Sequence, residues 1–142
     1  MHQVRKFLAP EIIHGPGARR WVGKAAHLLG MERVLLVGDA GILAAGWLLE
    51  AERLLQEAGL EVVRFTAVTP NPKDHEVEAG WRCYLEERCN GIVAVGGGSV
   101  MDCAKGIGIL AGNGGDIRDY AGVDTVPLPC PPLVCVPTTA GS

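Results

Sequence analysis

The chain has 142 residues, a formal net charge of −3 and a hydrophobic share of 48%, which together fit one domain with an aliphatic core. It contains no basic run interleaved with aromatic residues and no uncharged apolar stretch of about 18 residues, so neither a nucleic-acid surface nor a membrane span is expected. The N-terminus lacks a signal-peptide core and the five cysteines form no Cys-x-x-Cys pair, which indicates a reduced, cytoplasmic protein.

Strand-like apolar runs alternate along the chain with segments of helical periodicity, and glycines or prolines separate them. The expected elements are a strand pair over 3–8 and 11–14, a helix over about 17–29, a strand over 33–37, a helix over about 44–58, a strand over 61–68, a helix over 73–89, a strand at 92–95, a helix opened by Ser99 and a strand over 133–136. This alternation predicts an α/β fold, a Rossmann-like parallel sheet with right-handed crossovers and helices on both faces.

The most informative segment is GIVAVGGGSVMDCAKGIGIL, residues 91–110. An apolar strand leads into Gly96, Gly97 and Gly98, which have no Cβ and let a ligand approach the backbone. The helix that Ser99 opens presents unpaired N–H groups and the positive end of its dipole. A strand, a glycine turn and a helix in this order are typical of a site that holds a diphosphate.

A purely structural interpretation of this segment is also open. Ser99 and Asp102 have the spacing of a capping box, with aspartate in place of the usual Glu or Gln. The glycines could serve tight packing alone. Two specific phosphate motifs are excluded, because no Gly-Lys-Ser/Thr follows the turn and the G-x-G-x-x-G spacing is absent.

Polar residues follow four of the predicted strands, at the edge where parallel sheets bind ligands. The strand ends carry Asp39, Asn71, the glycine turn through Ser99, and the pair Thr138 and Thr139. An acid for a ribose diol, an amide, a phosphate turn and two hydroxyls are what a nicotinamide dinucleotide requires. Each residue alone has an ordinary alternative: Asp39 as a helix N-cap, Asn71 as a turn residue and the threonines as strand-end residues.

Four segments, LLVGDAGI, VTPNP, GGGSVMDCAKGIGIL and VPTTAGS, together resemble the iron-containing alcohol dehydrogenase family in order and spacing. The resemblance implies that Asp39 binds the adenosine ribose, that Asn71 lies at the adenine–ribose end and that the diphosphate turn holds the phosphates. Asp102 would lie on the cofactor side of its helix. The implied cofactor-binding residues are Asp39, Asn71, Gly97, Gly98, Ser99, Asp102, Thr138 and Thr139.

The same resemblance implies NAD as the cofactor and small alcohols, aldehydes or ketones as substrates. Residues 1–142 would be the N-terminal dinucleotide-binding domain, truncated at Ser142. The family holds its divalent metal, Fe or Zn, in a helical C-terminal domain that this sequence does not include. No catalytic residue and no metal ligand is therefore assigned here, the chain alone is expected to be inactive, and a homo-oligomer remains compatible with the resemblance.

Two other functions stay open at this point. One is a non-catalytic, regulatory nucleotide-binding module, and the other is a lyase of the dehydroquinate synthase type, which is similar in fold. Ser99 and Lys105 favour the dehydrogenase branch, because the glycine turn of the synthases usually lacks that serine and the later lysine.

Overall fold

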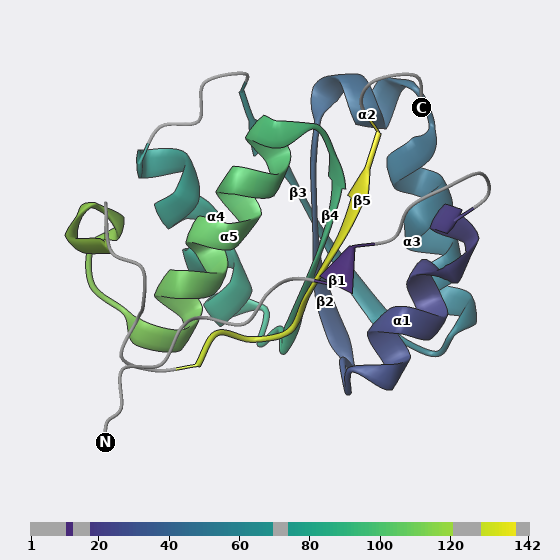
Figure 1. The fold of residues 1–142 in the computed structure, drawn as a ribbon, viewed down its shortest axis with the longest axis horizontal. Helices are drawn as coiled ribbons and strands as arrows, with labels where there is room; N and C mark the ends of the chain where they lie inside the picture. The colour runs from purple at the N-terminus through teal and green to yellow at the C-terminus, as the bar shows by residue number, and fades with distance from the viewer. Residues whose placement is uncertain (1–10, 13–17, 70–73, 121–128, 139–142) are drawn as a thin grey trace.

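In a computed structural model, which describes residues 11–12, 18–69, 74–120 and 129–138, the chain forms a five-stranded parallel sheet with helices packed on both faces (Figure 1). The strands lie in the order β1-β5-β4-β2-β3, and every pair of neighbours is parallel. The predicted α/β class with a parallel sheet is confirmed.

The elements follow one another as the alternation predicts. In chain order they are β1 (Glu11–Ile12), the 3-10 helix η1 (Ala18–Trp21), α1 (Val22–Leu28), β2 (Arg33–Asp39), α2 (Ala40–Ala44), α3 (Trp47–Glu57), β3 (Glu61–Val68), α4 (Asp74–Glu86), β4 (Gly91–Gly96), α5 (Gly98–Asn113), the 3-10 helix η2 (Ile117–Tyr120) and β5 (Leu133–Pro137).

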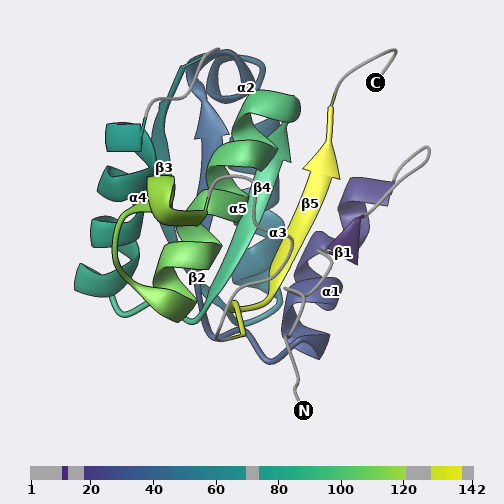
Figure 2. The ribbon, with the colours of Figure 1, turned by 60° about the vertical axis from the view of Figure 1, so that its left-hand side comes forward.

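The central strands are apolar on both sides because helices cover both faces of the sheet. Leu35, Ile92 and Cys135 point toward the layer formed by α4 and α5. Their neighbours Leu36 and Val93 point toward the opposite layer, which contains α1 and α3. Figure 2 shows the sheet between these two helical layers. Each face of the sheet therefore has its own hydrophobic core, and β4, at the centre of the sheet, is buried along its whole length.

The helix expected over 44–58 is in fact two helices. Helical structure begins directly after Asp39 as α2, and Gly46, at a φ of +86°, separates α2 from α3. Gly59 ends α3 at a φ of +90°, as predicted. In α3, Leu48 and Leu55 are buried whereas Leu49 is exposed.

Two other boundaries also differ from expectation. The helix expected over 73–89 ends at Glu86, and Arg88 takes a left-handed conformation with a φ of +58°, so Gly91 belongs to β4 and does not close the helix. The helix expected over about 17–29 begins as the 3-10 turn η1. The described pairing of β1 is with β5, and the residues 3–8 that the sequence suggested as its partner lie outside the described ranges.

Among the residues that the structure describes, no helix is both long and apolar enough to cross a membrane.

Candidate functional site

The strand order creates a topological switch point between the carboxyl ends of β2 and β4. The chain leaves β2 toward α2 and α3, and it leaves β4 toward α5, which lies on the opposite face of the sheet (Figure 1). The two connections diverge between neighbouring strands, since Val37 of β2 pairs with Ala94 of β4. Such a switch point is where open parallel sheets bind ligands. Two of the predicted site segments, Asp39 and the glycine turn, stand on its two sides.

Asp39 occupies the last position of β2 and the N-cap of α2. Its Oδ1 accepts a hydrogen bond of 2.9 Å from the backbone N–H of Ile42. The N-cap alternative that the sequence left open is thus observed. It uses one carboxylate oxygen, so it does not compete with a ligand for the other oxygen, Oδ2.

The glycine turn begins α5 one residue earlier than expected. Gly98 is the first helical residue and Gly97 is the N-cap, and no side chain caps this helix. The capping-box interpretation of Ser99 and Asp102 is therefore wrong, because Ser99 already lies inside the first turn. An α-helix leaves the N–H groups of its first turn without intrahelical acceptors. At α5 the N-cap residue, Gly97, offers no side chain to accept from these donors.

Gly96 and Gly98 differ in what a side chain at each position would meet. At Gly96 the φ is +152°, and an added Cβ would lie 2.8 Å from Cγ2 of the buried Val100. At Gly98 an added Cβ would meet nothing within 4 Å, and φ lies outside the left-handed region. The fold itself requires glycine at Gly96, whereas it leaves open space over Gly98.

The other predicted site residues are placed as follows. Thr138, directly after β5, donates its backbone N–H to the Gly96 carbonyl at 3.1 Å, which brings the end of β5 beside the glycine turn. Asp102 is exposed on α5, away from the buried stripe of Val100 and Cys103. Asn71 and Thr139 lie outside the described residues. Three of the four predicted strand ends can therefore be located, and their backbones meet at one edge.

The cysteines supply no reactive thiolate to this region. None of the five takes part in a disulfide. Burial raises the pKa of each thiol, and that of Cys103 reaches about 12. Lys105 opposes the effect at Cys135 through its positive charge. Thiols with raised pKa values are poor nucleophiles, so the buried cysteines, Cys89, Cys103 and Cys135, act as packing residues.

One polar cluster at this edge was missed by sequence reasoning. Glu76, in the first turn of α4, is 7% exposed and is buried by its neighbours. Its Oε1 accepts from the backbone N–H of Thr69 at 3.0 Å, and its Oε2 accepts from the Thr69 hydroxyl at 2.8 Å. A signal was available, because a glutamate in a first helical turn often accepts from the residues that precede the helix.

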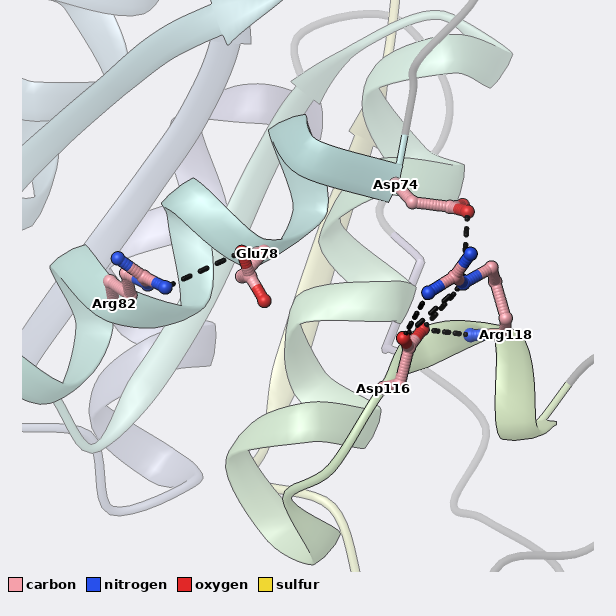
Figure 3. Close-up of polar contacts among 5 residues, drawn as sticks. All are labelled: Asp74, Glu78, Arg82, Asp116 and Arg118. Carbon is pink, nitrogen blue, oxygen red and sulfur yellow. Dashed lines mark hydrogen bonds and ion pairs between the residues drawn. The ribbon is translucent and has the colours of Figure 1, made fainter.

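An open groove of about 470 Å³ lies between the first turn of α4 and the segment that follows α5. Figure 3 shows Arg118 between Asp74 and Asp116 at its rim. Hydrogen bonds from Arg118 lower the pKa of Asp116 to about 2, although both side chains are in solvent. The guanidinium is thus already engaged by carboxylates. Of the predicted cofactor residues that the structure describes, none lines this groove.

The comparisons with known proteins agree with this geometry. A family model for iron-containing alcohol dehydrogenases matches residues 9–142. The chain is 46% identical over 139 residues to a 1,3-propanediol dehydrogenase of Klebsiella pneumoniae, covering 96% of this chain and 36% of the relative. A crystal structure of a 1,3-propanediol oxidoreductase matches with a TM-score of 0.88 and 43% identity, covering 99% of this chain and 37% of that one.

A second solved structure is that of a sulfoacetaldehyde reductase from Bifidobacterium kashiwanohense in complex with NAD⁺. It matches with a TM-score of 0.78 and 29% identity, over 99% of this chain and 38% of that one. The chain thus spans little more than a third of the length of the relatives it matches. The family match extends from residue 9 to the last residue, and the motifs at the glycine turn and the strand ends fall within it. The chain therefore belongs to the iron-containing alcohol dehydrogenase family.

Proposed function

We propose that residues 1–142 are the dinucleotide-binding portion of an NAD-linked oxidoreductase that interconverts small alcohols and aldehydes or ketones. The observation that carries the proposal is Gly98. A glycine in the first turn of a helix costs about 1 kcal/mol relative to alanine, and neither φ nor packing demands it here. A ligand that occupies the space over its backbone would account for it, and the family membership supports a dinucleotide diphosphate as that ligand.

The chain's own groups would then act by binding and orientation. The first-turn N–H groups of α5 would donate to the diphosphate, and the helix dipole would favour its negative charge. Asp39 would accept from a ribose hydroxyl, while Thr138, Asp102 and the undescribed Asn71 and Thr139 would line the nucleoside portions. When bound, the nicotinamide ring supplies the hydride chemistry.

The direct test is a calorimetric titration of the chain with NAD, in which absence of binding would refute the proposal.

The carboxylate of Asp39 leads to an expected preference for NAD over NADP, because it would attract a 2′-hydroxyl and repel a 2′-phosphate. We expect the wild-type chain to bind NAD more tightly than NADP by at least about tenfold, or about 1.4 kcal/mol. Asp39→Gly should shift the preference toward NADP. Titrations of both cofactors measure the ratio.

The control for this prediction is Asp39→Asn, because the amide oxygen can still accept from the Ile42 N–H and so preserve the N-cap. Both variants should lose the preference, but only Asp39→Gly should also lose the side-chain cap, which costs a few tenths of a kcal/mol because glycine is tolerated at an N-cap. Equal affinities of the wild-type chain for the two cofactors would show that Asp39 does not face the ribose.

Binding without turnover is the expected behaviour of a preparation of these residues alone. The chain spans about 36% of its relatives, and in the described part of it no group of three His, Cys, Asp or Glu side chains could hold a metal. We expect no NADH formation from short alcohols with added Fe²⁺ or Zn²⁺ under conditions where NAD binds. Clear turnover by the pure chain would contradict the assignment of residues 1–142 as a cofactor-binding portion only.

A further inference from the structure

Glu76 is the one charged side chain that the structure buries among the residues it describes. Taking a carboxylate out of water costs several kcal/mol, and partners offset that cost only when the geometry is good. Its described hydrogen bonds come from the backbone N–H and the hydroxyl of Thr69, at 3.0 and 2.8 Å. A neutral side chain would fill this place at lower cost, so the charged group requires an explanation beyond packing.

The two hydrogen bonds tie the end of β3 to the start of α4. Thr69 directly follows Val68, and Val68 is the Cα partner of Asp39 in the β2–β3 pairing. The register between the two strands shifts between Val37 and Asp39, so the regular ladder is interrupted just before this point. Glu76 therefore fixes the strand end beside Asp39 where the strand pairing itself is irregular.

The same carboxylate also faces the helix of the glycine turn. Its negative charge acts on Cys103, in the second turn of α5, and adds to the burial that raises the pKa of that thiol. The neighbouring Val77 packs against Gly106 of α5 closely enough that a Cβ added there would lie 2.9 Å from Val77 Cγ1. Glu76 is thus placed where β3, α4 and α5 meet.

We propose that Glu76 is a positioning residue for the adenosine end of the cofactor site, acting through Thr69 on the strand end beside Asp39. The inference rests on the proposed function, because it assigns a role within the same site. It differs from simple helix capping in one respect: a cap would affect the stability of the fold, whereas a positioning residue also affects the affinity of a folded protein for its ligand.

Whether Glu76→Ala weakens or strengthens NAD binding distinguishes a positioning role from a simple effect of charge. A dinucleotide is an anion, so removing a negative charge near it should strengthen binding if charge alone mattered. We expect Glu76→Ala instead to weaken NAD and ADP-ribose binding by about tenfold, since the end of β3 loses the two hydrogen bonds that Glu76 accepts from Thr69. Binding of nicotinamide mononucleotide, which lacks the adenosine, should change less than about twofold.

Three further variants accompany Glu76→Ala. Glu76→Gln keeps an acceptor for the Thr69 N–H and offers a donor to its hydroxyl, so it should retain affinity within about twofold. Thr69→Val removes only the hydroxyl and should weaken NAD binding by about threefold. Glu78→Ala is the matched control, because Glu78 is an exposed acid on the same helix whose described ion pair is with Arg82.

A double-mutant cycle tests the route through Asp39. If Glu76 acts on the strand end beside Asp39, Glu76→Ala should reduce the NAD over NADP preference in the wild-type background and have no effect on it in Asp39→Asn. A purely structural glutamate would leave the preference unchanged in both. Urea unfolding of each variant shows that the titrations are made on folded protein.

The experiment is calorimetric titration of the 142-residue chain and these variants with NAD, NADP, ADP-ribose and nicotinamide mononucleotide. Selective loss of affinity for the adenosine-containing ligands in Glu76→Ala and Thr69→Val supports the inference. A different outcome would separate the two proposals. If the wild-type chain binds NAD and Gly98→Val does not bind it, the proposed function stands. If in the same experiment folded Glu76→Ala binds NAD as tightly as the wild-type chain, the role of Glu76 is overturned. If the wild-type chain binds neither NAD nor ADP-ribose, both are overturned.

Discussion

Replacing Gly98 with valine is expected to abolish NAD binding in a chain that still folds. A Cβ at this position meets nothing within 4 Å and φ is not left-handed, so the free energy of unfolding should change by less than about 1 kcal/mol. The new side chain would occupy the space that the diphosphate needs. Affinity for NAD should fall by at least about 100-fold, which corresponds to about 2.7 kcal/mol. Calorimetric titration measures this loss, with circular dichroism to establish the fold.

Graded substitution sharpens the test at this position. Gly98→Ala adds one methyl group and should weaken NAD binding by less than Gly98→Val, because the alanine Cβ excludes less of the ligand. Gly97→Val is expected to act in the same direction. If folded Gly98→Val binds NAD as tightly as wild type, the phosphates lie elsewhere and the open space over Gly98 has no ligand.

Replacing Gly96 with valine should have the opposite outcome, a loss of stability. Its φ of +152° is a region that L side chains rarely adopt, and the added Cβ would lie 2.8 Å from Val100 Cγ2. Val100 is fully buried and β-branched, so it has no rotamer into which it can move away. Strain and overpacking together should lower the free energy of unfolding by about 3 kcal/mol.

The measurement for Gly96→Val is urea or thermal unfolding beside Gly98→Val, which makes the same chemical change two residues away. A loss of about 3 kcal/mol should lower the melting temperature of a chain of this size by about 10 °C. A Gly96 variant as stable as the wild-type chain would mean that the turn relaxes, and the contrast between the two glycines would then have no structural basis.

Much of the fold follows from local patterns. The strand at 133–136 was predicted almost to the residue, because burial on both sides of a parallel sheet requires continuous apolar sequence. The strand at 61–68 was predicted from its β-branched and aromatic residues and from the turn residues that bound it, although it is a partly exposed edge strand. The break at Gly46 was not predictable in the same way, since the apolar spacing continues through it. Arg88 gave no signal for its left-handed turn, because that conformation is usually marked by glycine or asparagine.

The candidate site was less accessible to sequence reasoning than the fold. The glycine turn and Asp39 stood out because their residue types are unusual at strand ends, and the sheet order then places both at the switch point. Whether Asp39 caps a helix or binds a ligand could not be decided from residue type, and the cap that is present occupies only one of its oxygens. For Glu76, the position in a first helical turn was a local signal for its hydrogen bonds to Thr69, but its burial depends on packing between β3, α4 and α5 and could not be read from the sequence.

The pairing of β1 with β5 joins the two ends of the described chain, and this has a consequence for how the protein forms. Glu11 lies opposite Val134, so the first strand has no described partner until residues 133–137 have been synthesised. Until then β4 also has one bare side, because β5 is its second neighbour. Sheets closed by contacts so distant in sequence fold slowly, and their unpaired strands are exposed to aggregation meanwhile. We therefore expect the β5–β1 side of the sheet to be the last part of it to form during synthesis.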